Sequence, residues 1–176
     1  MTYQITVEHC IAIYDQDVRC GVLIGRARLE SAVAAPFQTW GGEDLFPSLA
    51  AKAARLAYGI AEAQAYSDGN KRLALLCTDA FLWANGTRLM LTNDAVADLI
   101  LGIGTKKYTC DDLAKAFADA LTLAQRLVAE AGVDLVCAAS TARPLLGLDS
   151  VLAVAPDLEP IEAQDTALTA ALTLAF

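Results

Sequence analysis

Apolar residues recur at three- and four-residue intervals along most of the first 127 residues of the chain. The clearest run lies between Asn70 and Asn85. Its apolar members are Leu73, Leu76, Cys77, Ala80, Phe81 and Ala84. This spacing places their side chains on one face of an α-helix. Asn85-Gly86 ends the run, because both residues tolerate a left-handed backbone. The periodicity therefore restricts the fold to packed amphipathic helices.

The same periodicity, with polar capping residues in front of the runs, predicts four more helices. Their expected ranges are 7–15, 48–66, 92–101 and 109–127. Thr6 and Ser48 are the expected caps of the first two helices. The spacing of Thr109 and Asp112 matches a capping box, in which each residue bonds to the backbone of the other.

Shorter segments separate these helices. One or two helical turns are expected at 29–35, closed by a proline. The branched, glycine-flanked residues 20–25 predict a short extended segment, and Gly41-Gly42 predicts a loop. Trp40 and Trp83 are expected to pack in the core or at a hinge. Residues 1–127 are therefore predicted to form an all-α bundle with a small extended flap.

The end of the chain differs in charge from the rest. Residues 128–176 hold seven acidic residues and one basic residue, a net charge of −6, whereas residues 1–127 hold 14 acidic and 12 basic residues, a net charge of −2. The patterns at 150–155 and 160–174 predict a short strand and a final helix. We therefore predict a domain at 1–127 and an acidic accessory tail at 128–176. The final helix either packs on the domain as a lid, or extends the bundle or mediates contacts between copies.

The composition argues against several classes of protein. A hydrophobic content of 56% with only five prolines is not that of a disordered or collagen-like chain. The mean hydropathy is +0.41, but no uncharged apolar run approaches the roughly 18 residues that a membrane span needs. The net charge of −8 argues against a nucleic-acid partner, because phosphates repel an acidic chain.

Cysteine and histidine restrict the chemistry further. The five cysteines show no C-x-x-C spacing, which predicts reduced thiols and a cytoplasmic protein. The single histidine, His9, excludes a site built from several histidines.

One pentapeptide, Asp68-Gly69-Asn70-Lys71-Arg72, carries a recognisable chemistry. It opens a predicted helix, whose N-terminus presents unpaired N–H groups and a partial positive charge. Gly69 lets this backbone approach an oxyanion closely, and Lys71 and Arg72 add full positive charges. Asp68 offers a carboxylate to Mg²⁺, which prefers carboxylate and phosphate oxygens. The pentapeptide therefore predicts a site for the phosphates of a magnesium-bound nucleotide.

Residues 64–72 form the string Gln-Ala-Tyr-Ser-Asp-Gly-Asn-Lys-Arg. Three other segments accompany it: Leu-Glu-Ser-Ala at 29–32, Thr-Trp-Gly-Gly-Glu-Asp-Leu-Phe-Pro-Ser-Leu-Ala at 39–50, and Phe-Leu-Trp-Ala-Asn-Gly at 81–86. The first string resembles the Fic/Doc family motif H-x-F-x-[D/E]-[G/A]-N-K-R. With the other segments it resembles the Doc (death-on-curing) branch of that family most closely. The resemblance covers about residues 1–127 and implies an all-α Fic/Doc fold with ATP and Mg²⁺ as cofactors.

The resemblance also implies a role for each motif residue. Asp68 would coordinate Mg²⁺. Gly69 and Asn70, with Lys71 and Arg72, would bind the nucleotide phosphates, and Lys71 and Arg72 would also act in catalysis by stabilising phosphate charge.

Further implications concern the loop and the partners. Tyr66, where the family more often has Phe, would be buried and anchor the loop, and residues 21–26 would be a flap that clamps a target peptide by strand-like pairing. Fic relatives transfer AMP from ATP to a protein hydroxyl. Doc toxins instead transfer phosphate to a translation elongation factor, and a small antitoxin folds a helical segment onto them to silence them.

The sequence departs from the family at the first motif position, where Gln64 stands in place of His. The histidine accepts the proton of the attacking hydroxyl, and an amide has no comparable basicity. Losing such a base typically lowers the rate by about 100- to 10,000-fold. Glu62 is a possible substitute, but in a continuing helix it would point elsewhere. Nothing in the sequence places His9 at this site.

Three explanations of Gln64 remain open: an engineered inactive variant, a natural pseudoenzyme, or a reaction in which phosphate positioning supplies most of the rate. We expect a Doc-like toxin of a toxin–antitoxin system. Its reaction would be Mg-ATP-dependent transfer of phosphate, and less readily of AMP, to a protein hydroxyl, with Gln64 leaving this transferase inactive or weakened. The alternative is a non-catalytic Fic/Doc-like protein that binds nucleotide or a protein partner as a regulator.

Overall fold

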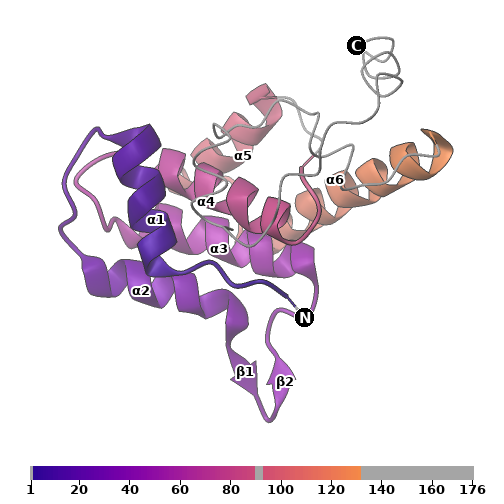
Figure 1. Ribbon diagram of the computed structural model, residues 1–176, viewed down its shortest axis with the longest axis horizontal. Coiled ribbons are helices and arrows are strands. Elements are labelled where there is room, and N and C mark those ends of the chain that lie inside the picture. Colours follow the sequence, from indigo (N-terminus) through magenta and orange to yellow (C-terminus); the bar gives the residue numbers. More distant parts are fainter. Residues whose placement is uncertain (1, 90–92, 132–176) are drawn as a thin grey trace.

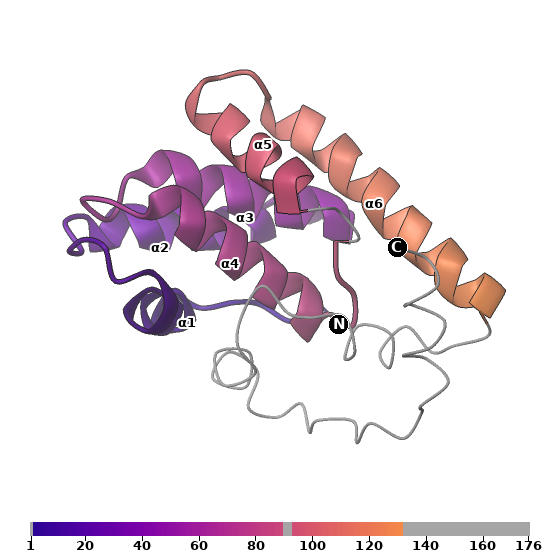
Figure 2. The same cartoon turned by 90° about the horizontal axis from the view of Figure 1, so that it is seen from above.

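Two antiparallel helices, α3 (Leu49–Ala63) and α4 (Asn70–Ala84), form the centre of the computed structural model (Figure 1). The structure describes residues 2–89 and 93–131. The other α-helices are α1 (Val7–Ile13), α2 (Arg26–Ala34), α5 (Asn93–Gly104) and α6 (Cys110–Ala131). α3 packs against α2, α4, α5 and α6, while α1 packs on α4. Figure 2 shows α1 and α6 on opposite sides of the α3–α4 pair. The predicted all-α bundle is confirmed.

Capping residues begin the helices where the sequence predicts them. The Thr6 hydroxyl accepts from the backbone N–H of His9, whose Nδ1 accepts from the Thr6 N–H at 3.2 Å. The Ser48 hydroxyl accepts from the N–H of Ala51. Thr109 and Asp112 form the predicted reciprocal pair in front of α6. These bonds satisfy N–H groups that a helix N-terminus otherwise leaves unpaired.

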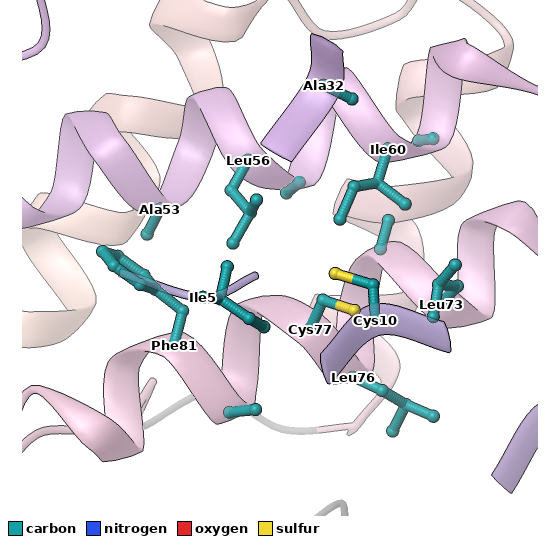
Figure 3. Packing of buried hydrophobic residues seen from close by; sticks show 14 of the residues in the cluster. Ile5, Cys10, Ala32, Ala53, Leu56, Ile60, Leu73, Leu76, Cys77 and Phe81 are labelled. Atoms are coloured by element: carbon teal, nitrogen blue, oxygen red, sulfur yellow. The ribbon is translucent and has the colours of Figure 1, made fainter. Parts of the chain in front are cut away.

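The core lies between α3 and α4 and combines large side chains with alanines. Leu56 and Ile60 of α3 face Phe81 and Leu73 of α4, all fully buried. Alanines on the same helices also have no exposed surface and let the backbones approach closely. They are Ala53, Ala54, Ala57 and Ala74. Cys10 of α1 lies next to Cys77 of α4 (Figure 3), and both are free and buried.

Two buried charges are paired across elements. Lys52 donates to the Asp44 carboxylate at 2.6 Å and to the carbonyl oxygen of Phe46 at 2.7 Å. Arg88 contacts the Asp79 carboxylate at 2.7 Å, and both side chains are buried. A buried charge is tolerated only with a partner. Each pair therefore keeps a flanking segment next to a central helix.

Several element ends differ from the predictions. α3 ends at Ala63 rather than at 66, because Gln64 takes a left-handed conformation with φ of 45°. α5 continues to Gly104, three residues beyond 101. After α1 the chain forms a π-helical turn, Tyr14–Val18, and after α2 a 3₁₀ turn, Ala35–Phe37. Side-chain periodicity is too coarse to place such ends, which backbone conformation decides.

The Gly41-Gly42 loop proves to be the turn of a small hairpin. It joins the antiparallel strands β1 (Thr39–Trp40) and β2 (Glu43–Asp44), and both glycines have positive φ, as a tight two-residue turn requires. Trp40 on this hairpin is 79% exposed, so the prediction that it packs in the core or at a hinge is wrong. Trp83 packs against the core as expected.

Two predictions concern other parts of the chain. The strand at 150–155 and the helix at 160–174 lie outside the described residues. Within the described ranges, no helix combines the length and the apolar character needed to cross a bilayer.

Candidate functional site

The turn between α3 and α4, residues 64–70, is closed by the side chain of Asn70. Its Nδ2 donates to the carbonyl oxygen of Tyr66 at 2.7 Å, and its Oδ1 accepts from the Tyr66 N–H at 2.9 Å. This reciprocal pair gives the loop a defined shape immediately before α4. The Asn70 side chain is thereby committed to the loop, so its backbone N–H is the group left for an anion.

The π-helical turn after α1 packs against this loop. Tyr14, which is buried, donates its hydroxyl to the carbonyl oxygen of Asp68 at 2.9 Å. Gly69 has φ of 80°, and a Cβ there would lie 2.5 Å from Val18 Cγ1 and 2.6 Å from Cys20 Sγ. Glycine is therefore required at 69 both by conformation and by space.

Tyr66 is buried, as predicted, and its ring stacks on that of Tyr14 with centroids 3.5 Å apart. Burial raises the pKa of Tyr66 to about 12 and also raises the pKa of Tyr14. Both phenols are therefore neutral near pH 7. Among the described residues the Tyr66 hydroxyl has no hydrogen-bond partner.

The extended segment before α2 is attached to the same loop. Ser67 N–H donates to the carbonyl oxygen of Val22, and Ile24 N–H donates to that of Ala65. Leu23 thus lies opposite Tyr66 in an antiparallel bridge. In such a bridge the N–H and C=O of Leu23 point away from the loop, and among the described residues neither group has a hydrogen-bond partner. Val22 and Ile24 are exposed.

The N-terminus of α4 has no side-chain cap. The N–H groups of Asn70, Lys71 and Arg72 have no acceptor in the described part of the chain. Asp68 accepts from the Gly69 N–H through Oδ1 at 2.6 Å, which leaves Oδ2 free. Free N–H groups at a helix N-terminus and the helix dipole both favour a bound anion.

These groups line an open cleft of about 810 Å³. The cleft brings together all the residues of the predicted site, Gln64, Asp68, Gly69, Asn70, Lys71 and Arg72. Its charged lining residues are the basic Arg28, Lys71 and Arg72 and the acidic Asp68. A chain of net charge −8 therefore has a cleft whose lining is net positive.

The cleft offers few donor groups to Mg²⁺. Within the described residues no cluster of three or more acidic, histidine or cysteine side chains could hold a metal ion. The cleft supplies one free carboxylate oxygen, on Asp68. Mg²⁺ commonly binds one or two carboxylates together with substrate phosphates. The residues therefore fit a metal that arrives with a phosphate ligand, and not a separately held ion.

Glu62, the possible substitute for the motif histidine, and His9, the single histidine of the chain, both lie elsewhere. Glu62 lines a smaller neighbouring hollow of about 280 Å³, on the side of α3 that carries Arg55 and Tyr58. His9 forms the capping box of α1 and stacks on Tyr3. Gln64 itself is exposed at the cleft, at the end of α3.

Sequence reasoning missed two residues of this site, Tyr14 and Arg28. Tyr14 lies 54 positions before Asp68, and no local pattern links them. Arg28 lies two residues after the predicted flap at 21–26, and a basic residue at that place was the available signal. Lys71, in contrast, was expected, and its Cε lies against Gly104 at the carbonyl end of α5, where a positive charge is favoured.

Known proteins and protein families show similarity to this chain. The Fic/DOC family model matches residues 4–82. The protein called Toxin Doc from Mycolicibacterium smegmatis is 36% identical over 99 residues, which are 55% of this chain and 76% of that protein. No solved structure matches.

The helical fold, the 64–72 motif on its loop and these matches identify the chain as a member of the Fic/DOC family. Within that family it belongs to the Doc branch.

Proposed function

We propose that this chain is a Doc-like toxin of a toxin–antitoxin system whose cleft binds the phosphates of Mg-ATP. The observation that carries the proposal is the uncapped N-terminus of α4, with its free N–H groups, in a net positive cleft of an acidic chain. The match to Toxin Doc supports the biological role.

Each motif residue has a proposed task. The N–H groups of residues 70–72 bind phosphate oxygens, and Lys71 and Arg72 balance phosphate charge. The free Oδ2 of Asp68 is available to Mg²⁺, which when bound would bridge phosphate oxygens and neutralise their charge. Tyr14, through the Asp68 carbonyl, positions this loop.

The flap supports a protein substrate. Its outer edge, at Leu23, is open, and an extended peptide can add to it as a further strand. We propose that a target peptide binds there and brings a side-chain hydroxyl to the cleft. By resemblance to other Doc proteins, the target would be a translation elongation factor, the partner that silences the chain would be an antitoxin, and both would be cytoplasmic.

The proposed reaction is phosphate transfer, in preference to AMP transfer. The hydroxyl oxygen forms a bond to the γ-phosphorus, the bond from that phosphorus to the β–γ bridging oxygen breaks, and ADP leaves. The hydroxyl proton needs an acceptor, and Gln64 does not provide one. We therefore propose that the reaction is slow or absent in this chain, with water as the remaining proton acceptor.

A second candidate function follows from Gln64 itself. A chain that retains a complete phosphate loop but lacks the base can act as a pseudoenzyme, which regulates by holding nucleotide or a protein partner. Gln64 is exposed at the cleft, and Glu62 and His9 do not line it. Because neither Glu62 nor His9 is placed to replace the base, this arrangement favours the second candidate.

One experiment separates the two functions. This chain and its Gln64→His variant are incubated in a cytoplasmic extract with ATP labelled on the α- or the γ-phosphate. We expect the variant to transfer the γ-label to protein far faster than the parent chain. Transfer of the α-label would instead identify AMP transfer. If neither chain transfers label although both bind nucleotide, the transferase proposal is wrong and the pseudoenzyme is supported.

A further inference from the structure

Arg28 lines the cleft from α2, outside the 64–72 motif. It is in the first turn of α2 and lines both the cleft and the smaller hollow. Its guanidinium group is folded over Gly25, where a Cβ would lie 2.4 Å from its Nε and 2.6 Å from its Nη2. Because the Gly25 N–H is bonded to the Ala65 carbonyl, the guanidinium group lies beside the segment that pairs with the loop just after α3.

The charge of Arg28 has no partner within the described residues, since no hydrogen bond or ion pair involves its guanidinium group. Arg26, two residues earlier on the same helix, contrasts with it. Arg26 contacts Glu8 at 2.8 Å and Glu30 at 2.9 Å and does not line the cleft. The same helix thus carries one arginine balanced by acids and one whose five donors are free for a ligand.

The cations of the cleft come from different elements. Lys71 and Arg72 follow the N-terminus of α4, with Lys71 lying against α5. Arg28 comes from α2 on the flap side. A single phosphate seated on the α4 N-terminus can use the α4 cations alone. A ligand with a chain of phosphates can reach Arg28 as well, and guanidinium binds phosphate oxygens with paired, charge-assisted hydrogen bonds.

We propose that Arg28 is a further phosphate-binding residue that makes the cleft prefer a triphosphate over a monophosphate. The proposal rests on the nucleotide binding proposed above and specifies which ligands the same cleft selects. It assigns the selectivity to α2, outside the 64–72 motif.

Calorimetric titration with AMP and with a non-transferable ATP analogue, both with Mg²⁺, tests the proposal. The proteins are the full chain and its Arg28→Ala, Arg28→Lys and Arg26→Ala variants. We expect Arg28→Ala to bind the triphosphate about tenfold more weakly and AMP unchanged. Arg28→Lys should fall between, because it keeps the charge and loses the paired geometry. Arg26→Ala, which changes the net charge equally, should bind both ligands like the parent chain.

Three results would overturn the proposal: unchanged triphosphate binding in Arg28→Ala, an equal loss for AMP and triphosphate, or an equal loss in Arg26→Ala. Each of them leaves the proposed function in place if the parent chain binds the analogue. Absence of nucleotide binding by the parent chain would overturn the proposed function and this inference together. Thermal unfolding of each variant checks folding. We expect it to be unchanged in the Arg28 variants, because Arg28 is exposed and unpaired, and little changed in Arg26→Ala, because exposed ion pairs contribute little to stability.

Discussion

Two stacked tyrosines beneath the loop at 64–69 differ in one hydrogen bond. The Tyr14 hydroxyl donates to the Asp68 carbonyl oxygen, whereas the buried Tyr66 hydroxyl has no partner among the described residues. An unpaired buried hydroxyl is unfavourable, while a paired one is mildly stabilising. Tyr66 occupies a position where the family motif has Phe. Its hydroxyl oxygen, which Phe lacks, makes no hydrogen bond among the described residues.

We predict opposite effects on stability for the two Tyr→Phe substitutions. Tyr66→Phe should raise the free energy of unfolding by about 1 kcal/mol, because it removes an unsatisfied hydroxyl. Tyr14→Phe should lower it by about 1 kcal/mol and weaken Mg-nucleotide binding, because it releases Asp68. Urea denaturation and titration measure both effects. A destabilised Tyr66→Phe variant would show that the Tyr66 hydroxyl does have a hydrogen-bond partner.

His9 has a structural role and gives stability a pH dependence. Partial burial lowers the pKa of His9, and its neutral Nδ1 accepts from Thr6. An unfolded histidine titrates at about 6.5, so below that pH the unfolded chain binds more protons than the folded chain. This contribution to stability is complete above about pH 6.5 and is lost as the pH falls through the lowered folded value.

We therefore predict that His9→Gln flattens this dependence. Glutamine keeps an acceptor at the third helical position, as in a usual capping box, and does not titrate. The loss of unfolding free energy between about pH 7.5 and about pH 5.5 should be smaller in the variant than in the parent chain. Denaturation curves at the two pH values measure it. Equal losses in the two proteins would show that His9 does not contribute.

At the scale of elements, the N-terminus of α4 depends on Gly69. Its φ is positive, and Val18 and Cys20 leave no room for a Cβ. Gly42 in the hairpin also has positive φ, but nothing lies within 4 Å of a Cβ placed there. The two glycines separate the cost of backbone strain from the cost of crowding.

We predict that Gly69→Ala lowers the free energy of unfolding by about 2–4 kcal/mol, the sum of strain and overpacking. Gly42→Ala should cost only the strain, about 1–2 kcal/mol. Nucleotide binding should be lost in the first variant, because the N–H groups of α4 move, and unchanged in the second. Titration of both variants with the ATP analogue checks this, and retained binding in Gly69→Ala would contradict the proposed cradle.

Most elements and the starts of the capped helices could be predicted from the sequence, but several C-terminal ends could not. The caps at Thr6, Ser48 and Thr109 act over three residues, so the sequence contains both partners. The end of α3 is set by the left-handed backbone at Gln64, within a loop closed by Asn70 and bonded to the flap. Periodicity alone extended the helix to 66, because it does not record these contacts.

At the scale of the whole molecule, the charge of the cleft is opposite in sign to the net charge of the chain. The chain carries −8, but the cleft lining has three basic residues and one acidic residue. Nucleotide binding should therefore reflect a balance between local attraction and overall repulsion. Salt screens both, and its effect on affinity reports which one dominates.

We predict that the local attraction dominates. Affinity for the ATP analogue should fall between about 0.05 M and about 0.5 M NaCl, and Arg28→Ala should show a shallower decrease. Titrations at the two salt concentrations measure this. An affinity that rises with salt would mean that the net charge governs binding and that the cleft cations contribute little.

The division of the chain into 1–127 and 128–176 remains a prediction. α6 continues to Ala131, so the predicted boundary lies within a helix. The family match ends at residue 82 and does not reach this boundary. The acidic tail is proposed as an accessory segment on the strength of its charge alone.

The sequence by itself determined the all-α class, the helices with their caps and the position of the 64–72 motif between two helices. These features depend on residues three or four positions apart or on one short motif, so local physics is sufficient to predict them. Only the tertiary structure decided that Tyr14 holds Asp68, that Arg28 faces the cleft, that Trp40 is exposed and that Glu62 and His9 lie away from it. Each of these depends on how distant segments pack, and packing is a property of the whole chain.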